Sequence, residues 1–244
     1  MQIQVHFLPT LAERDDFSDD VVVVIDVLRA TTTMVHALAA GAKQIHTCRT
    51  VEQARELKKQ LSGKALLGGE RGGSKIPGFD LGNSPLEYTP AVVSGRSIVF
   101  TTTNGTVALE HAATAKQVVI GAFVNLTAVC NLVQDVPRLH LLCAGTNGEI
   151  TREDVLFAGA VCEEMSNSSA VDSLNDQGVL ARNAWQNAIV NLGSCSLFDS
   201  LRESSGARNL IEIGHERDIE IAATVDQFDF VPVFQEGIVG RAKP

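Results

Sequence analysis

The chain has 244 residues, of which 45% are hydrophobic and 20% are charged. These proportions are those of an ordinary globular protein and exclude a disordered, collagenous or low-complexity chain. Lys and Arg together number 20 and Asp and Glu together number 29, which gives a net charge of −9. An acidic chain with 5% aromatic residues is poorly suited to bind nucleic acid or an anionic membrane surface, so we expect neither as a partner.

The cysteines and the N-terminal sequence indicate a cytoplasmic protein. The five cysteines contain no C-x-x-C zinc or redox pair, and an odd, scattered set is typical of a reducing compartment. They are Cys48, Cys130, Cys143, Cys162 and Cys195. Residues 1–16 show no basic start followed by an apolar run, so we expect no signal peptide. The longest unbroken apolar run, Val21–Ile25, is far too short for a membrane span.

Strand-like and helix-like segments alternate through the first two-thirds of the sequence. Residues Val21–Val27 are mostly β-branched and apolar on both faces, which predicts a buried parallel strand. A helix is expected at Thr31–Ala40, with Gly41 ending it. Further strands are expected at Gln44–Thr47, Ala65–Leu67, Ser97–Phe100, Val118–Ile120 and Leu139–Cys143, and further helices at Val51–Leu61, Thr106–Ala115 and Leu126–Val133. This alternation predicts an α/β fold with a mostly parallel sheet flanked by helices, in which ligands bind beyond the carboxyl ends of the strands.

Two stretches depart from this alternation. Residues 68–90 are rich in glycine and contain three prolines, which predicts a long irregular loop. We favour a functional role for this loop over that of a plain linker, because it carries Glu70, Arg71 and Asp80.

The second departure begins after Cys143. Helices are expected at Arg152–Met165, Asn175–Leu192, Leu197–Glu203 and Ala207–Ile213, and closing strands at Ile219–Thr224 and Phe230–Phe234. We therefore expect an α/β sheet region at 1–150 and a second, dissimilar α/β part at 151–244.

Polar side chains gather after several of the predicted strands. After the first of them, Asp26 is followed by Arg29 and by the hydroxyls of Thr31 and Thr32 at the start of a helix. A helix N-terminus and an arginine suit a phosphate, and an aspartate suits Mg²⁺. The alternative is that these side chains only cap the helix.

Two further segments offer anion-binding or metal-binding groups. In the glycine-rich loop, Glu70 is a candidate metal ligand and Arg71 a candidate anion clamp, unless the two form a surface ion pair. Residues 101–106 combine hydroxyls with backbone N–H groups around Gly105, which suits an oxyanion, although they also suit a helix cap. This segment lacks the lysine of a Walker A loop, so a nucleoside triphosphate site is not expected.

The last segment, 143–154, begins with Cys143 and ends with Asp154. A tyrosine-phosphatase loop needs an arginine six residues after its cysteine, and residue 149 is glutamate, so we favour a structural Cys143 over a nucleophile. Asp154 is either a metal ligand or an ordinary charge at a helix start. Leu28 stands where the haloacid-dehalogenase mechanism needs a second aspartate, and the six histidines form no zinc pattern.

Five segments in this order resemble one family, the 2-phosphosulfolactate phosphatases, over nearly the whole chain. They are residues 26–33, 69–73, 79–85, 101–106 and 143–146. The resemblance implies an α/β fold with two dissimilar parts and a Mg²⁺-dependent hydrolase. The implied reaction converts (2R)-2-phospho-3-sulfolactate and water to 3-sulfolactate and inorganic phosphate, a step on one route to coenzyme M.

With this reaction in view we expect the site residues as follows. The catalytic residues are Asp26, Arg29, Glu70 and Arg71. The metal ligands are drawn from Asp26, Glu70, Asp80 and Asp154. The phosphate-binding residues are Thr31, Thr32, Asn83, Ser84, Thr101, Thr102, Thr103, Asn104, Gly105 and Thr106. A homo-oligomer is compatible with a small enzyme of this kind. The alternatives are a phosphatase for another small anionic phosphoester and a non-catalytic protein that binds an anionic metabolite.

Overall fold

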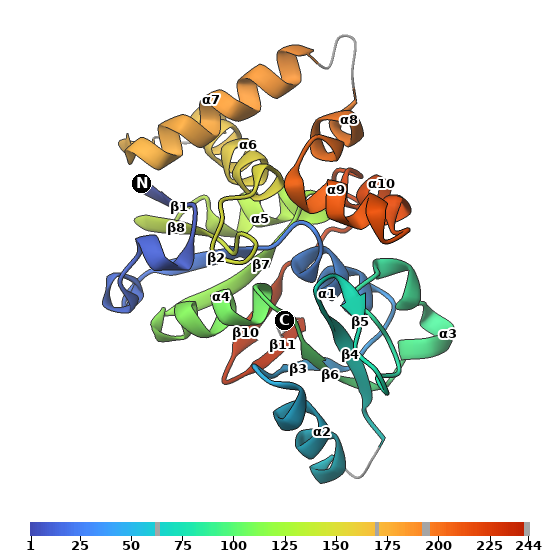
Figure 1. Cartoon of the computed structure of the whole chain (residues 1–244). Helices are drawn as coiled ribbons and strands as arrows, with labels where there is room; N and C mark the ends of the chain where they lie inside the picture. Colours follow the sequence, from blue (N-terminus) through green and yellow to red (C-terminus); the bar gives the residue numbers. More distant parts are fainter. Residues whose placement is uncertain (62–63, 169–170, 192–195, 242–244) are drawn as a thin grey trace.

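The computed structural model describes residues 1–61, 64–168, 171–191 and 196–241 (Figure 1). Its strands form one mixed, eleven-stranded sheet with the order β5-β4-β6-β3-β11-β10-β7-β2-β8-β1-β9. They are β1 (Gln2–His6), β2 (Val21–Ile25), β3 (Gln44–Thr47), β4 (Leu66–Arg71), β5 (Ser74–Lys75), β6 (Ser97–Thr101), β7 (Gln117–Gly121), β8 (Arg138–Cys143), β9 (Ser173–Leu174), β10 (Pro232–Gln235) and β11 (Ile238–Arg241). Helices flank this mostly parallel sheet, which confirms the predicted α/β fold class.

Two parallel groups of strands are joined by a C-terminal hairpin. Strand β2 pairs in parallel with β7 and β8, so that Val24 lies opposite Ile120 and Leu142. Strand β6 pairs in parallel with β3 and β4. The hairpin β10–β11 lies between the two groups and pairs antiparallel with β7 on one side and with β3 on the other.

The helices cover the sheet and surround the carboxyl ends of several strands (Figure 1). They are α1 (Ala30–Ala39), α2 (Val51–Gln60), α3 (Pro90–Val93), α4 (Gly105–His111), α5 (Leu126–Val133), α6 (Arg152–Ser168), α7 (Asp176–Asn191), α8 (Leu197–Arg202), α9 (Ser205–Glu212) and α10 (Glu216–Ala222). Helices α6 and α7 lie side by side, and α8, α9 and α10 form a separate group. Within the described ranges, no helix is both long and apolar enough to cross a membrane.

Packing on both sides of the sheet explains why the sequence of β2 is apolar on both faces. Val21, Val23 and Ile25 pack into a cluster that also contains residues of α5 and α6. Val22 and Val24 pack into a second cluster, which contains residues of α1 and α4. All five side chains of β2 are therefore buried, as the unbroken apolar run predicts.

Two predictions about local structure are wrong. Ile219–Thr224 is not a strand, because most of it lies in helix α10, whose buried side chains Asp218, Ile219 and Ala222 recur at helical spacing. The loop predicted at 68–90 is not irregular at its start, because β4 continues through both glycines to Arg71. The two glycines pair with β6, and Glu70 and Arg71 pair with β5, so β4 is stabilised by neighbouring strands that its own sequence pattern does not reveal.

The later part of the chain contributes to the same sheet as the earlier part. Strands β9, β10 and β11 all follow residue 150 and belong to the sheet. The division at residue 150 stays a prediction, and in the folded protein the two regions share one sheet. Cys195 lies outside the described residues, and the other four cysteines are buried and free.

Candidate active site

A cavity of about 380 Å³ lies where β2, β4 and β8 end and where α9 approaches the sheet. Its size is that of a small-molecule site. The predicted site residues that line it are Asp26, Arg29, Glu70, Asn83 and Asn104. Other polar side chains in its wall are Thr146, Asn147, Glu149, Ser205 and Asn209. The carboxyl ends of separate strands thus bring together residues that lie far apart in the sequence, as expected for an α/β sheet.

Asp26 lies directly after β2 at the start of α1. Its Oδ1 accepts a hydrogen bond from the backbone N–H of Ala30 at 3.0 Å. Burial raises the pKa of this carboxyl, repulsion from Glu70 and Glu153 adds to the rise, the Ala30 N–H opposes it, and the resulting pKa is about 7. The charge of Arg29 acts in the opposite direction. Asp26 is therefore a buried carboxylate whose negative charge is poorly balanced by the protein alone.

Arg29 is buried beside this carboxylate, and its side chain is fixed from two directions. Nη1 donates to Asp218 Oδ2 at 2.7 Å, and Nη2 donates to the carbonyl of Gly73. Because a guanidinium has five N–H donors, these two contacts leave donors for a ligand in the cavity.

Glu70 and Arg71 point to different surroundings, because consecutive side chains of a strand lie on opposite faces. Glu70 lines the cavity and accepts from the backbone N–H of Gly73 at 2.8 Å and of Thr103 at 2.7 Å. Arg71 donates to the carbonyls of Glu70 and Arg49 and is not a lining residue. The structure therefore brings Glu70 to the cavity and leaves Arg71 outside its wall.

The threonines after β2 fasten the loop rather than face the cavity. Thr31 Oγ1 donates to the carbonyl of Asp26 at 2.8 Å, and Thr32 Oγ1 donates to the carbonyl of Val27 at 2.8 Å. Both hydroxyls are buried and neither residue lines the cavity. The side chain that bonds a backbone N–H at this helix start is that of Asp26, whereas the two threonine hydroxyls donate to carbonyls of the preceding loop.

The threonines after β6 are also occupied by the protein. Thr101 Oγ1 accepts from Arg71 Nη2 at 2.8 Å, and Thr102 Oγ1 accepts from the backbone N–H of Thr106 at 3.1 Å. Thr106 Oγ1 donates in turn to the carbonyl of Thr102. The Thr103 hydroxyl lies 3.3 Å from Glu70 Oε2. These groups hold the turn into α4 in place.

Of the other predicted phosphate-binding residues, two amides reach the cavity. Asn104 Oδ1 accepts from the backbone N–H of Asn147 at 3.0 Å. Asn83 is buried, and within the described part of the chain its Oδ1 has no hydrogen-bond partner. Ser84 Oγ donates to Asp218 Oδ1 at 2.6 Å, and Ser84 itself does not line the cavity. A buried amide oxygen without a partner is rare and points to a group that the protein binds there.

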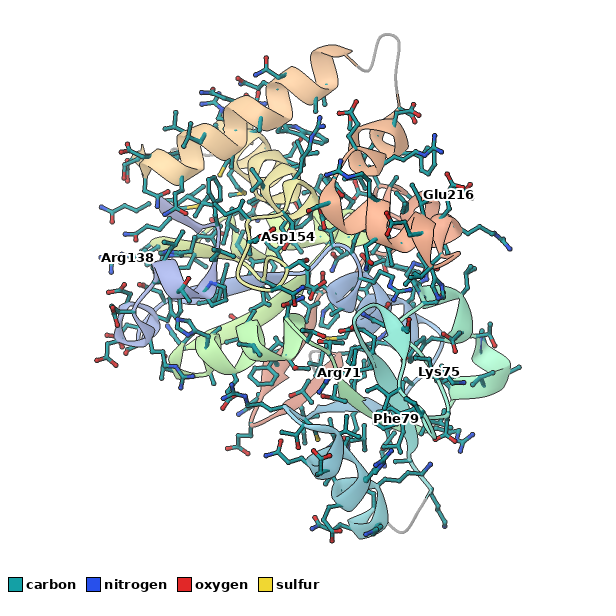
Figure 2. The ribbon with its side chains drawn as sticks, in the orientation of Figure 1. Arg71, Lys75, Phe79, Arg138, Asp154 and Glu216 are labelled. Carbon is teal, nitrogen blue, oxygen red and sulfur yellow. The ribbon has the colours of Figure 1, made fainter. Side chains whose placement is uncertain are left out.

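The two remaining predicted metal ligands lie in different places. Asp154 is buried at the start of α6, where it accepts from the backbone N–H of Val27 at 2.9 Å and of Gly145 at 3.1 Å (Figure 2). It thereby ties the loop after β2 to the loop after β8. Asp80 is exposed and outside the cavity wall, where it pairs with Lys58 at 2.7 Å and accepts from the N–H of Leu67.

Sequence reasoning missed two buried carboxylates. Glu153 is 1% exposed, and among the described residues its Oε2 has no hydrogen-bond partner. Burial raises the pKa of Glu153, and the charge of Glu153 raises the pKa of Asp26 by repulsion. The sequence signal that could have marked Glu153 is its position next to Asp154 in the first turn of a helix. Asp218 is 1% exposed and contacts Arg29, but it lies next to a segment predicted as a strand, so no pattern marked it.

The donor chemistry fits Mg²⁺, although the described side chains do not form a closed cage. In the part of the chain that the structure describes, no three His, Cys, Asp or Glu side chains are close enough to hold a metal ion on their own. Mg²⁺ commonly uses one or two carboxylates together with substrate phosphate and water. Asp26 and Glu70 supply such carboxylates, and the unpartnered oxygens of Glu153 and Asn83 lie in the same region. The residues present therefore fit the ion.

The thiol of Cys143 does not take part in this site. It is fully buried at the end of β8, and burial raises its pKa well above the usual range of a thiol. A buried thiol that stays protonated is a poor nucleophile, which agrees with the structural role that we favoured from the sequence.

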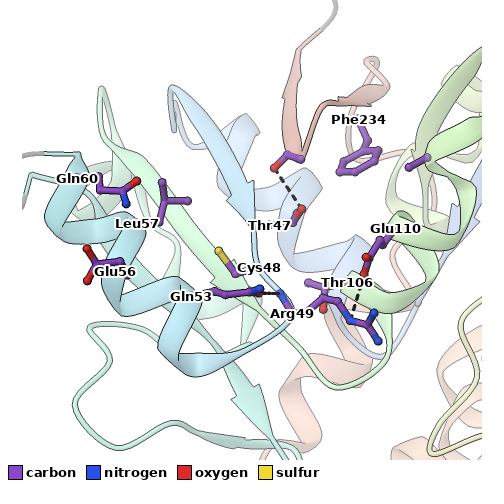
Figure 3. Close-up of a pocket in the computed structure, with 12 residues that line it drawn as sticks. Thr47, Cys48, Arg49, Gln53, Glu56, Leu57, Gln60, Thr106, Glu110 and Phe234 are labelled. Carbon is purple, nitrogen blue, oxygen red and sulfur yellow. Dashed lines mark hydrogen bonds and ion pairs between the residues drawn. The ribbon is translucent and has the colours of Figure 1, made fainter.

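A second cavity, of about 520 Å³, lies between α2 and α4 (Figure 3). Arg49 and Glu110 form an ion pair of 3.1 Å in its wall, and both side chains are largely exposed. The lining residue Cys48 has a pKa that burial raises. Of the predicted site residues only Thr106 lines this cavity. The predicted catalytic carboxylates Asp26 and Glu70 line the first cavity.

The fold and the site define an α/β enzyme whose cavity, at the ends of its strands, is built from carboxylates and one buried arginine. The family model described as 2-phosphosulpholactate phosphatase matches residues 6–237, and the chain belongs to this family. This confirms the family resemblance and the prediction of an enzyme, a phosphatase.

Proteins named "Probable 2-phosphosulfolactate phosphatase" are similar over nearly their whole length. The protein of Caldanaerobacter subterraneus subsp. tengcongensis is 40% identical over 228 residues, which are 92% of this chain and 91% of the relative. That of Thermotoga petrophila is 40% identical over 216 residues, which are 88% and 89% of the two chains. That of Carboxydothermus hydrogenoformans is 39% identical over 240 residues, which are 97% and 95%.

Proposed function

We propose that this protein hydrolyses (2R)-2-phospho-3-sulfolactate to 3-sulfolactate and inorganic phosphate, with Mg²⁺ as its cofactor. The family membership and the names of the relatives support the substrate. The observation that carries the Mg²⁺-dependent reaction is the group of buried, mutually repelling carboxylates around Asp26, next to the buried Arg29. The coenzyme M route is the pathway that the resemblance implies for this reaction.

The charge of the cavity supports the need for a cation. Three carboxylates, those of Asp26, Glu70 and Glu149, line the described cavity together with one guanidinium, that of Arg29. The substrate itself carries a phosphate, a carboxylate and a sulfonate. An anionic ligand in an acidic cavity requires positive charge that these side chains do not supply.

Asp26 and Glu70 would hold the ion, because both carboxylates line the cavity. When bound, Mg²⁺ supplies a Lewis acid for the phosphoryl oxygens and lowers the pKa of bound water. Asp154 would support the site without holding the ion, because it does not line the cavity and its two oxygens accept backbone N–H groups of the loops after β2 and β8. Asp80 is left out of this proposal, because its carboxylate is engaged by Lys58 outside the cavity.

Arg29 would donate its free N–H groups to the phosphoryl oxygens as charge redistributes in the transition state. Asn83 and Asn104 would position the other polar groups of the substrate, because both line the cavity. A carboxylate that the cation does not use would take the proton of the attacking water. These roles require only residues that the structure places in or next to the cavity.

The test is phosphate release from 2-phosphosulfolactate and from a panel of other small phosphomonoesters, each with Mg²⁺ and with EDTA. Metal-dependent release that is fastest with 2-phosphosulfolactate supports the proposal. Faster release from another ester keeps the mechanism and replaces the substrate. No release from any ester by folded protein, combined with tight ester binding, would indicate a binding protein instead.

A further inference from the structure

We infer that Asp218 is a positioning residue that holds Arg29 in the orientation needed to bind a phosphoryl group. This inference rests on the proposed function of the cavity. Asp218 lies in α10, and its carboxylate is 1% exposed. Its Oδ2 accepts from Arg29 Nη1 at 2.7 Å, and its Oδ1 accepts from Ser84 Oγ at 2.6 Å.

Burial makes this contact decisive for the position of the guanidinium. The side chains of Arg29 and Asp218 are 2% and 1% exposed, so neither charge is solvated by bulk water. A buried charge is tolerated when it is paired and hydrogen-bonded, and removing one partner leaves the other uncompensated. Asp218 is the anionic partner in this pair, whereas the second fixed contact of Arg29 is the neutral carbonyl of Gly73.

The geometry leaves Arg29 available for a ligand. Asp218 and Gly73 each take one N–H of the two terminal nitrogens, and Arg29 still lines the cavity. A planar guanidinium that is held at one edge presents its other donors in a fixed direction, which is how arginine recognises phosphate oxygens. Asp218 itself is not a lining residue, so it acts through Arg29 and does not touch the substrate.

The same carboxylate joins two more parts of the chain to this arginine. Ser84 precedes a short helical turn, Pro85–Glu87, and His215 Nδ1 lies 3.4 Å from Asp218 Oδ2. The Asp218 carboxylate therefore connects α10, the segment after β5 and the loop after β2. When α10 packs on the sheet region, Asp218 therefore also fixes the position of the Arg29 guanidinium.

The experiment is a double-mutant cycle read out by binding of inorganic phosphate, measured by calorimetry with Mg²⁺ in excess. The variants are Asp218→Asn, Arg29→Ala and the double variant. Asp218→Asn keeps the shape and removes the charge; its amide oxygen can still accept from Arg29, while its NH₂ group can donate to the hydroxyl oxygen of Ser84. We expect each single substitution to weaken phosphate binding by about tenfold or more, and the double variant to bind no more weakly than Arg29→Ala alone. The kcat/KM of the ester should follow the same pattern.

Glu163→Gln is the matched control. Glu163 pairs with Arg182 at 2.6 Å between α6 and α7, outside the cavity wall, so this variant loses a more exposed carboxylate–arginine pair without touching Arg29. Its phosphate binding should equal that of the wild type. Circular dichroism and thermal unfolding establish that each variant is folded.

Three results would overturn the inference. The first is unchanged phosphate binding in Asp218→Asn, and the second is a double variant whose loss is the sum of the two single losses. The third is a wild-type protein that binds no phosphate at millimolar concentration. Failure of the proposed function is distinguishable, because coupled losses of phosphate binding without hydrolysis of any ester would retain the role of Asp218 and reject the reaction.

Discussion

Gly105 lies so close to Asp26 that a Cβ atom at position 105 would be 2.7 Å from Asp26 Oδ2. The same atom would be 2.6 Å from the Cβ of Ala30. Helix α4 thus begins against the carboxylate that follows β2, and only a residue without a side chain fits between them. The close approach of these two segments keeps Asp26 at the edge of the cavity.

Gly105→Ala should therefore reduce activity by displacing Asp26. The added methyl group must push aside either the carboxylate or the start of α1, and overpacking of this kind costs about 1–3 kcal/mol of stability. We expect kcat to fall by about tenfold or more in the steady-state assay. Gly240→Ala is the control, because among the described residues other than its chain neighbours no atom lies within 4 Å of the added Cβ. Full activity of Gly105→Ala would show that Asp26 does not need this position.

Arg29→Ala should impair catalysis far more than Arg71→Ala. Arg29 lines the cavity, whereas Arg71 contacts the carbonyls of Glu70 and Arg49. We expect kcat/KM to fall by more than tenfold for Arg29→Ala, which corresponds to more than about 1.4 kcal/mol of transition-state stabilisation. Arg71→Ala should show the smaller loss in kcat/KM. Equal losses in the two variants would contradict the placement of Arg71 outside the site.

Asp26→Asn should abolish turnover and yet stabilise the protein at alkaline pH in EDTA. The pKa of this carboxyl is raised to about 7 in the folded state, above the ordinary value of 3.8. Between these values the folded state binds a proton that the unfolded state has lost, so rising pH costs stability, and the loss is complete above about pH 7. The asparagine variant has no such loss.

The measurement for Asp26→Asn is urea unfolding at pH 5 and pH 8, each with EDTA. The stability of the variant relative to the wild type should increase from pH 5 to pH 8. A constant difference between the two proteins across this range would show that the Asp26 carboxyl has an ordinary pKa.

Buried histidines should make the protein less stable below neutral pH. Burial lowers the pKa of His6 and of His36 to about 4, and it also lowers that of His140. Below the ordinary value of 6.5 the unfolded chain binds protons that the folded protein does not, so stability falls as the pH falls towards 4. His6 and His36 each contribute about 1.4 kcal/mol per pH unit in this range.

His36→Leu isolates one of these groups. His36 packs edge-on against Phe228, and among the described residues its Nε2 has no hydrogen-bond partner. The free energy of unfolding from urea titrations at pH 7.5, 6 and 5 should fall less steeply in this variant than in the wild type. Because the other groups titrate in both proteins, an identical slope would contradict a depressed pKa for His36.

Sequence patterns predicted the sheet because the buried parallel strands are long apolar runs, as in Val21–Ile25. They failed at α10 because its short stretch of isoleucine and alanine is compatible with either a strand or a helix, and only packing against α9 and the loop after β2 decides between them. Candidate residues Asp26, Arg29 and Glu70 were found because they follow apolar strands. The opposite orientations of Glu70 and Arg71 required the course of β4, which the glycines concealed.

The contacts of buried acidic side chains could not be predicted from sequence patterns either. Asp154 was recognised as a charge at a helix start, but its contacts with Val27 and Gly145 depend on how two loops meet in space. Asp218 is 189 positions away from Arg29 in the sequence, and a single sequence contains no periodic signal for a contact over that distance.

The position of the hairpin β10–β11 has a consequence for synthesis on the ribosome. Residues 232–241 are translated after every other strand of the described sheet, yet they pair with β3 on one side and β7 on the other. Until they leave the exit tunnel, the edges of β3 and β7 that they will occupy are unpaired, although every other strand of the described sheet has already been made. The nascent chain must therefore keep two open sheet edges from pairing wrongly until residues 232–241 have been made, and termination before residue 232 would leave both edges exposed.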